Sequence, residues 1–218
     1  MLLVMPENDS ANLAIRCSCG SVQGTAEGVT PANTNRLLCY CDDCQAFVHY
    51  LERPKEFLDP NGGSDVVQMS AGRIRFSEGQ DKLTCVRLTK SGLVRWYSSC
   101  CNSPLGTTMP TRQIPFVGLI RSSIESTTNG SSVDEAIGPV RARVQGRFAV
   151  GNTENLGVSD KPPFGVLMRL ARILLGARFR GDHLKSPYFD SQSAEPVVAP
   201  RVLSTVERQK LEEARVTL

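Results

Sequence analysis

The chain contains little histidine, few aromatic residues and almost no imbalance of charge. Two histidines and one tryptophan occur among 218 residues, and aromatic side chains make up 6% of the total. The formal net charge of +3 is too small to indicate nucleic-acid binding by itself, so we expect no nucleic-acid partner. His49, in the apolar sequence AFVHYL, is expected to be partly buried and hydrogen-bonded, and His183 is expected at the surface. The sequence therefore offers no identifiable general base.

Long apolar runs are also missing. The N-terminal sequence MLLVMPENDSAN has neither the basic start nor the longer apolar segment of a signal peptide. Within residues 164–181, Arg169 and Arg172 interrupt the apolar sequence too soon for a membrane span. We therefore expect a cytoplasmic protein in a reducing compartment.

Cysteine is the residue type whose pattern is most informative. Eight cysteines fall into tight groups, at Cys17, Cys19, Cys39, Cys41, Cys44, Cys85, Cys100 and Cys101. Thiolates one to three residues apart reach a single ion easily, whereas disulfides between such close neighbours are strained. In a reducing compartment, clustered cysteines indicate metal ligands or redox groups.

Turn-forming residues and short apolar segments predict a mainly β fold. The chain has 18 glycines and 13 prolines, which favours many turns. We expect strands at Ile15–Cys19, Val22–Glu27, Asn35–Cys39, Val66–Ser70, Arg73–Phe76, Lys82–Thr89, Leu93–Ser98 and Phe116–Ile120. The fourth and fifth of these are expected to form a hairpin around Ala71 and Gly72, and the sixth and seventh form a second hairpin.

The segment after residue 121 differs in character. Ser122–Gly138 is rich in small polar residues and is expected to be a loop or the end of the first unit. Phe164–Gly181 predicts a basic amphipathic helix that packs its apolar side on the β domain, with a membrane surface or a partner as alternatives. That apolar side is expected to contain Leu167, Leu170, Ala171, Leu174 and Leu175. A capping box at Ser204–Glu207 predicts a short helix to about Ala214. Residues 161–218 carry ten basic and six acidic side chains, a net charge of +4.

The sequence CYCDDC at 39–44 combines two ligand spacings, CxC and CxxC. Three thiolates from one turn can occupy three corners of a zinc tetrahedron, and an open fourth corner is typical of catalytic zinc. Cys17 and Cys19 supply only two ligands and need a distant pair, for which Cys100 and Cys101 are the obvious source. We expect a brief helix over Asp42–Leu51, in which Asp42 and Asp43 act as helix caps or tune the cluster.

Four segments in order resemble the family of glutathione-dependent formaldehyde-activating enzymes and centromere protein V. They are CSCGSVQG at 17–24, CYCDDCQ at 39–45, LTKSGLVRWY at 88–97 and CCNSPLG at 100–106. The resemblance covers about residues 14–121, and residues 122–218 form a C-terminal extension without a counterpart in the enzyme core. We therefore expect two domains with this boundary.

The resemblance implies two packed or tent-like sheets pinned by two zinc ions, with helices appended at the C-terminus. It implies that Cys17, Cys19 and Cys101 hold a structural zinc. It also implies that Cys39, Cys41 and Cys44 hold a second zinc, which can accept a thiol such as glutathione.

The sequence departs from the family pattern at four positions. Ser98 stands where the first cysteine of the later pair belongs, and Asn102 replaces the usual glycine. Tyr40 stands in place of a common histidine, and Gln45 in place of a common arginine. The fourth structural ligand is then either Cys100, next to Cys101, or Cys85.

Two functions remain open on these grounds. The first is a carbon–sulfur lyase that acts on glutathione or a related thiol–aldehyde adduct, with Cys39, Cys41 and Cys44 as the catalytic zinc ligands. The second is a non-catalytic zinc module that presents its basic C-terminal segment to a partner. A redox-sensing thiol protein is a third possibility. Because all eight cysteines precede residue 102, removal of residues 160–218 is expected to leave the metal content unchanged.

Overall fold

Two β-sheets make up the body of the protein. The structure is a computed structural model that describes residues 10–127 and 130–215. The first sheet has the order β10 (Ile124–Thr127), β1 (Ala11–Arg16), β2 (Gln23–Val29) and β5 (Ile74–Glu78). The second has the order β11 (Arg143–Val144), β3 (Asn35–Cys39), β4 (Ser64–Ser70), β9 (Phe116–Ile120), β8 (Pro104–Thr108), β7 (Val94–Ser98), β6 (Leu83–Arg87) and β12 (Arg201–Val202). The predicted mainly β fold with two sheets is confirmed.

The main hydrophobic core contains side chains from both sheets. Along β1, Ala11, Leu13 and Ile15 are buried and alternate with more exposed residues, as expected for a strand with one covered face. Trp96 on β7 is fully buried, and its indole N–H donates to Thr108 Oγ1 at 3.0 Å. This hydrogen bond satisfies the one polar group that the large ring brings into the core.

The predicted hairpin around Ala71 and Gly72 is wrong, although both of its strands exist. β4 pairs with β3 and β9 in the second sheet, whereas β5 pairs with β2 in the first. A 3₁₀ helix at Ala71–Arg73 carries the chain from one sheet to the other. A Cβ at Gly72 would lie 2.4 Å from the Asp182 carbonyl oxygen, so the crossing needs glycine for close approach. The second predicted hairpin, now β6 and β7, is confirmed.

Residues beyond 121 contribute to both sheets. Within Ser122–Gly138, expected to be a loop, β10 pairs with β1 and is followed by the short helix α3 (Val133–Ile137). Further along the chain, β11 adds to β3 and β12 adds to β6, both in parallel. Tyr188 is fully buried against Trp96 and Phe76, and its hydroxyl donates to the Leu105 carbonyl at 2.6 Å. The C-terminal segment therefore supplies core residues and sheet edges alike.

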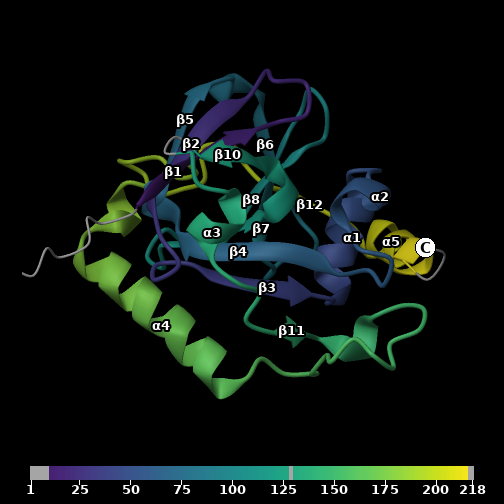
Figure 1. Cartoon of the computed structure of the whole chain (residues 1–218). Helices are drawn as coiled ribbons and strands as arrows, with labels where there is room; N and C mark the ends of the chain where they lie inside the picture. Colours follow the sequence, from purple (N-terminus) through teal and green to yellow (C-terminus); the bar gives the residue numbers. More distant parts are fainter. Residues whose placement is uncertain (1–9, 128–129, 216–218) are drawn as a thin grey trace, which may run out of the picture.

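Helices cover two regions of the second sheet (Figure 1). They are α1 (Asp42–Tyr50), α2 (Pro54–Phe57), α4 (Phe164–Phe179) and α5 (Thr205–Arg215). In Figure 1, α4 lies along β3 and β4, and α5 lies beside α1 on the opposite side. The capping box that begins α5 is confirmed, because Ser204 and Glu207 bond each other's backbone N–H groups. None of the described helices has the length and hydrophobicity needed to cross a bilayer.

The expected orientation of α4 is wrong in part. The helix buries Val166 and Ala177, whereas Leu167 and Leu175 are 48% and 58% exposed. Apolar residues surround most of this helix, so their spacing could not select the face that contacts the sheet.

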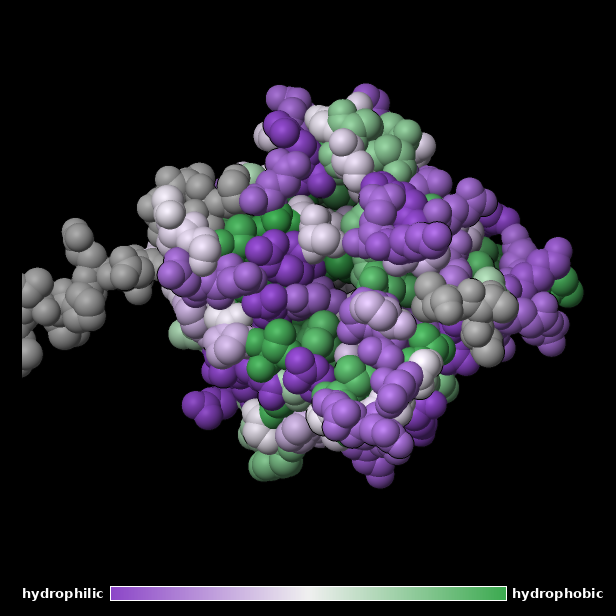
Figure 2. Space-filling model, turned by 45° about the vertical axis from the view of Figure 1, so that its right-hand side comes forward, coloured by the Kyte–Doolittle hydropathy of each residue, from purple (hydrophilic) through white to green (hydrophobic). Residues whose placement is uncertain are grey.

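The face in Figure 2, turned toward the α1 and α5 side, shows hydrophobic side chains in separate patches among hydrophilic ones.

Candidate metal centres

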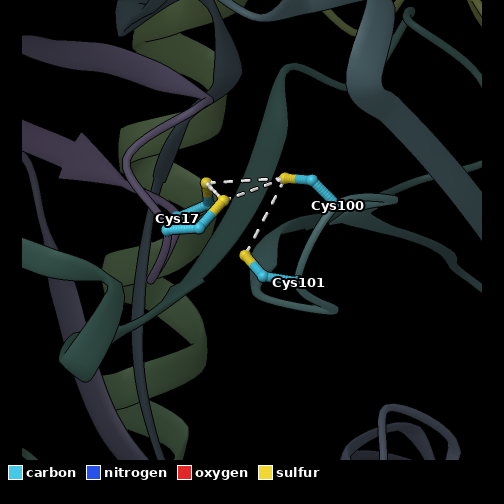
Figure 3. A group of neighbouring side chains, drawn as sticks. Cys17, Cys100 and Cys101 are labelled. Carbon is cyan, nitrogen blue, oxygen red and sulfur yellow. Dashed lines mark hydrogen bonds between the residues drawn. The ribbon is translucent and has the colours of Figure 1, made fainter.

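Four cysteines from distant segments meet in a first cluster (Figure 3). Their sulfur atoms all lie within 4.8 Å of one another, and they belong to Cys17, Cys19, Cys100 and Cys101. The Sγ atoms of Cys17 and Cys19 are 3.5 Å apart, and those of Cys19 and Cys100 are 3.3 Å apart. Zn–S bonds of about 2.3 Å in a tetrahedron would separate neighbouring sulfurs by roughly 3.8 Å. The donor set therefore fits a zinc ion, with Cys100 as the fourth ligand.

The loop between β1 and β2 positions Cys17 and Cys19. The Cys17 N–H donates to the Val22 carbonyl, and the Val22 N–H returns a hydrogen bond to Cys17 Sγ at 3.2 Å. Gly20 has a φ of +75°, a conformation that glycine adopts without steric cost. The loop therefore turns sharply enough for both thiols to face the same point.

A tight turn at residues 98–103 positions the other two cysteines. The Ser98 N–H donates to the Ser103 carbonyl, and the Ser103 N–H donates to Ser98 Oγ. Asn102 has a φ of +52°, a left-handed backbone conformation that asparagine tolerates well. The hydroxyl oxygens of Ser98 and Ser103 each lie 3.2 Å from Cys101 Sγ. Burial raises the pKa of Cys101, but the hydrogen bonds of Ser103 and Ser98 outweigh burial and lower it to about 5.

Arg53 connects the two halves of the first cluster. Its Nη1 donates to the Cys101 carbonyl and to Ser103 Oγ, both at 2.9 Å, and its Nη2 donates to Ser18 Oγ at 2.7 Å. Glu56 on α2 pairs with the same guanidinium and holds it in place. Sequence reasoning missed Arg53, because nothing in its spacing shows that α2 lies over the cluster.

Three cysteines form a second cluster where β3 ends and α1 begins. The sulfur atoms of Cys39, Cys41 and Cys44 lie within 4.8 Å of one another, and all three residues are partly buried. The N-cap of α1 is Cys41, whose sulfur accepts from the Cys44 N–H at 3.3 Å. The predicted role of Asp42 as the cap is therefore wrong, because Asp42 already lies in the first helical turn. The thiol that caps the helix thus also faces the cluster.

Arg95 brings a positive charge to this cluster. It is 3% exposed, its guanidinium contacts Cys44, and it lies 3.6 Å from Asp43. Hydrogen bonds from Cys39 and Cys41, together with the charge of Arg95, hold the pKa of Cys44 well below its usual range despite burial. Hydrogen bonds to its two neighbours raise the pKa of Cys41. Arg95 therefore favours the ionised cluster, which is the form that binds a metal.

Sequence reasoning missed Arg95, but a signal for it existed. It lies between Val94 and Trp96 in a strand that is buried on both faces, where an arginine needs an anionic partner.

A small cavity opens over the second cluster. It has a volume of about 200 Å³ and is mostly apolar. Its lining includes Cys39, Cys41, Cys44, Arg95, Phe47, Val66 and Ile120. Among the described residues, no fourth cysteine, histidine or carboxylate joins the three thiols in a ligand group. The three sulfurs would therefore suit a zinc ion, with no described protein ligand for a fourth position.

Other residues hold the loops around the second cluster. Gln45 is fully buried, and its Nε2 donates to the carbonyls of Tyr40 and Phe148 at 2.6 and 2.9 Å. Tyr40 is also buried and donates its hydroxyl to Asp59 at 3.0 Å. The departures at positions 40 and 45 thus have structural roles beside the cluster.

The remaining candidate residues lie away from both clusters. Cys85 is buried in the core and donates to the Val198 carbonyl at 3.3 Å, so it is not the fourth ligand. His49 is partly buried as expected, but its Nε2 has no hydrogen-bond partner among the described residues. The expected surface position of His183 is wrong, because the residue is 8% exposed and its ring contacts Arg178.

Comparison with known proteins gives a family but no activity. Among curated proteins, none matches the chain. A family model matches residues 10–198, which contain both cysteine clusters and α4 but end before β12 and α5. The chain belongs to this family, DUF6151, which is described as a family of unknown function.

Proposed function

We propose that the chain is a zinc protein with a structural site at the first cluster and a thiol-binding site at the second. In this proposal it makes or breaks the bond between the sulfur of a thiol, such as glutathione, and an aldehyde carbon. The observation that carries the proposal is the three-cysteine group beneath a cavity, with no fourth side-chain ligand among the described residues.

The two clusters differ in the way that structural and catalytic zinc sites differ. A structural site is closed by four protein ligands, and a catalytic site keeps one position open. When bound at the second cluster, zinc would supply the positive charge that turns a thiol into a thiolate near neutral pH. In the addition, the thiol sulfur bonds to the aldehyde carbon, and the thiol proton ends on the former carbonyl oxygen.

The surrounding residues support this chemistry through charge and shape. Three thiolates carry three negative charges, and Arg95 offsets one of them from a fully buried position. The walls of Phe47, Val66 and Ile120 keep the site poor in water, which strengthens the electrostatic contacts inside it. The cavity of about 200 Å³ is smaller than the roughly 300–1,000 Å³ of sites that enclose a whole ligand. It therefore suits the sulfur arm of a thiol, with the rest of the molecule outside.

The resemblance to glutathione-dependent formaldehyde-activating enzymes and centromere protein V supports the same proposal. The segments that carry it are the ones that build the two clusters, at 17–24, 39–45 and 100–106. Just before the last segment, Ser98 stands where the family has a cysteine. Cys100 takes its place as the ligand candidate, since its Sγ lies 3.9 Å from Cys17 Sγ.

Cobalt substitution tests the second site directly, because cobalt–thiolate bands report the ligands of the ion. We expect glutathione to change the spectrum of the cobalt-loaded protein and S-methylglutathione to leave it unchanged. The Cys41→Ser variant should lose the response, whereas the conservative Cys85→Ser variant should keep it. A parallel measurement follows the exchange between glutathione, formaldehyde and their adduct by NMR.

Two results would contradict the proposal in different ways. A spectrum that is insensitive to glutathione shows a closed second site and favours the alternative of a non-catalytic zinc module. A glutathione-sensitive spectrum without faster exchange keeps the thiol site but rejects the lyase activity.

A further inference from the structure

A large cavity lies beneath α4, away from both cysteine clusters. It has a volume of about 590 Å³ and lies between α4, the 3₁₀ crossing after β4 and the loop after β2. Five of the residues that line it are arginines: Arg73, Arg141, Arg169, Arg172 and Arg180. No acidic side chain lines it within the described ranges. Arg180 pairs with the nearby Asp182, but the other four arginines form no ion pair with a described residue.

Backbone carbonyls hold three of these arginines without neutralising them. Arg73 donates to the carbonyls of Glu27 and Gly28, and Arg169 donates to those of Thr34 and Pro31. Arg141 also donates to the Pro31 carbonyl, at 3.3 Å. These contacts fix the guanidiniums in place and leave their full charge, so the site is formed before any ligand arrives.

Of the other two arginines, one is neutralised by Asp182 and one has no acidic partner among the described residues. Arg180 pairs with Asp182 at 3.1 Å, and the same carboxylate accepts a hydrogen bond from Ser70 at 3.0 Å. Arg172 has no hydrogen bond or ion pair with a described residue. Burial and the charge of Arg180 lower the pKa of Arg73 despite the opposite effect of Asp182, and burial with Arg141 and Arg172 lowers the pKa of Arg169. Mutual repulsion therefore remains, and an anion would relieve it.

The N-terminus of α4 opens into the same cavity. Pro163 and Gly165 line it, Pro163 is the N-cap without a side-chain cap, and the first turn contains no acidic residue. In a helix of 16 residues, the free N–H groups and the aligned peptide dipoles favour an anion at this end. This observation is independent of the arginines and indicates the same ligand charge.

We propose that the cavity is a binding site for a multiply charged anion, such as the phosphate or diphosphate group of a small molecule or of a lipid headgroup. Guanidinium groups bind phosphate oxygens through paired hydrogen bonds, and several arginines around one cavity suit more than one phosphate. The site lies apart from the cysteine clusters and does not depend on the metal proposal.

Calorimetric titration with inorganic pyrophosphate tests the shared chemistry. We expect saturable binding that weakens as salt rises, and inorganic phosphate should bind less tightly. Arg172→Gln and Arg141→Gln should each weaken binding about tenfold or more, because each removes one charged contact. The control Arg87→Gln, on β6 near the opposite edge of the sheet, should leave binding unchanged.

An added negative charge at the start of α4 distinguishes an effect on anion binding from an effect on folding. A Cβ at Gly165 meets no atom within 4 Å, so Gly165→Asp fits the site. An acidic residue in the first turn favours the helix but repels an anion. We expect this variant to keep or raise its melting temperature and to lose pyrophosphate binding.

Vesicles distinguish the two sources of the phosphate group. Phe164 and Phe179 on α4 are 77% and 89% exposed, and a bilayer would bury them. If the ligand is a lipid, vesicles with phosphatidylinositol bisphosphate should bind the chain, and Phe164→Ser should reduce this binding but leave pyrophosphate affinity intact. If the ligand is soluble, pyrophosphate binds and the vesicles do not. No saturable binding of pyrophosphate, or equal weakening by Arg87→Gln, would overturn the proposal.

Discussion

Single residues at the clusters have more than one role, and Cys41 is the clearest case. Its thiol caps α1 and also faces Cys39 and Cys44. Serine is an even better N-cap than cysteine, so Cys41→Ser keeps the helix start and removes one ligand. The first cluster differs, because its four thiols connect the β1–β2 loop to the turn after β7.

Serine variants at the two clusters should therefore behave differently. We expect Cys17→Ser to lower the free energy of unfolding by roughly 4 kcal/mol or more, because metal binding at a closed site is also folding energy. Cys41→Ser should lose the second metal ion at a smaller cost in stability. Elemental analysis and thermal melts of both variants give the comparison. A Cys17→Ser protein as stable as the parent would reverse the assignment of structural and functional clusters.

Asn102 gives a second test at this scale. Its positive φ is strained for a β-branched residue, so Asn102→Val should destabilise the protein by roughly 1–3 kcal/mol. Asn102→Gly should stay within about 1 kcal/mol of the parent. Denaturant melts of the zinc-loaded variants measure both values. Equal stability of the valine variant would show that the turn at 98–103 does not constrain the cluster.

Among the elements, α5 has a direct connection to the second cluster. Arg208 on α5 pairs with Asp42 at 3.2 Å and with Asp43 at 2.8 Å, and its side chain is only 12% exposed. Asp43 in turn lies beside Arg95, which contacts Cys44. Leu203 and Leu211 pack in the same region, in a hydrophobic cluster with Phe47 of α1. The helix farthest along the chain thus supports the first turn of α1.

Arg208→Ala should weaken metal binding at the second cluster and leave metal binding at the first unchanged. We expect metal affinity at the second cluster to fall about tenfold, as for other groups that orient metal ligands, with roughly 1–2 kcal/mol lost in stability. Lys210→Ala changes an exposed residue of the same helix and should have no effect. Competition with a chromophoric chelator measures both sites. Loss of affinity at both clusters alike would instead indicate a general folding defect.

At the scale of the whole molecule, the two sheets and the C-terminal segment share one core. Tyr188 fills space between Trp96 and Phe76, and β10 and β12 pair with strands of different sheets. Although residues 160–218 contain no cysteine, these contacts lead us to predict that their removal also affects the metal clusters. That removal would expose the core and take Arg208 away from Asp42 and Asp43.

Removal of metal should occur in two steps. A chelator should first extract the ion held by three cysteines, and the ion held by four cysteines later, because fewer protein ligands hold the former. The second step should lower the melting temperature sharply, since a ligand that binds only the folded state stabilises it. Metal release and melting temperature, followed over chelator concentration, give the order. A single step with no change in melting temperature would contradict the structural role of the first cluster.

Local information in the sequence was sufficient for several strands and for the second cluster. It missed β8, and the strand expected at Ile15–Cys19 is wrong in part, because β1 already ends at Arg16. The strands Asn35–Cys39 and Phe116–Ile120 have their predicted bounds, because alternation and turns are properties of neighbouring residues. Cys39, Cys41 and Cys44 meet because they lie within six residues. The gathering of Cys17, Cys19, Cys100 and Cys101 could be predicted from ligand number, since two thiols cannot complete a zinc site.

Only the tertiary structure decided the features that depend on distant segments. The crossing at Gly72 between two sheets, the contact of Arg95 with Cys44 and the position of Arg53 over Cys101 all join residues whose proximity no local pattern records. The face of α4 was undetermined for a similar reason, because an apolar helix can bury more than one side. The arginine cavity likewise exists because the fold brings Arg73 and Arg141 beside α4, and charge repulsion alone would keep them apart.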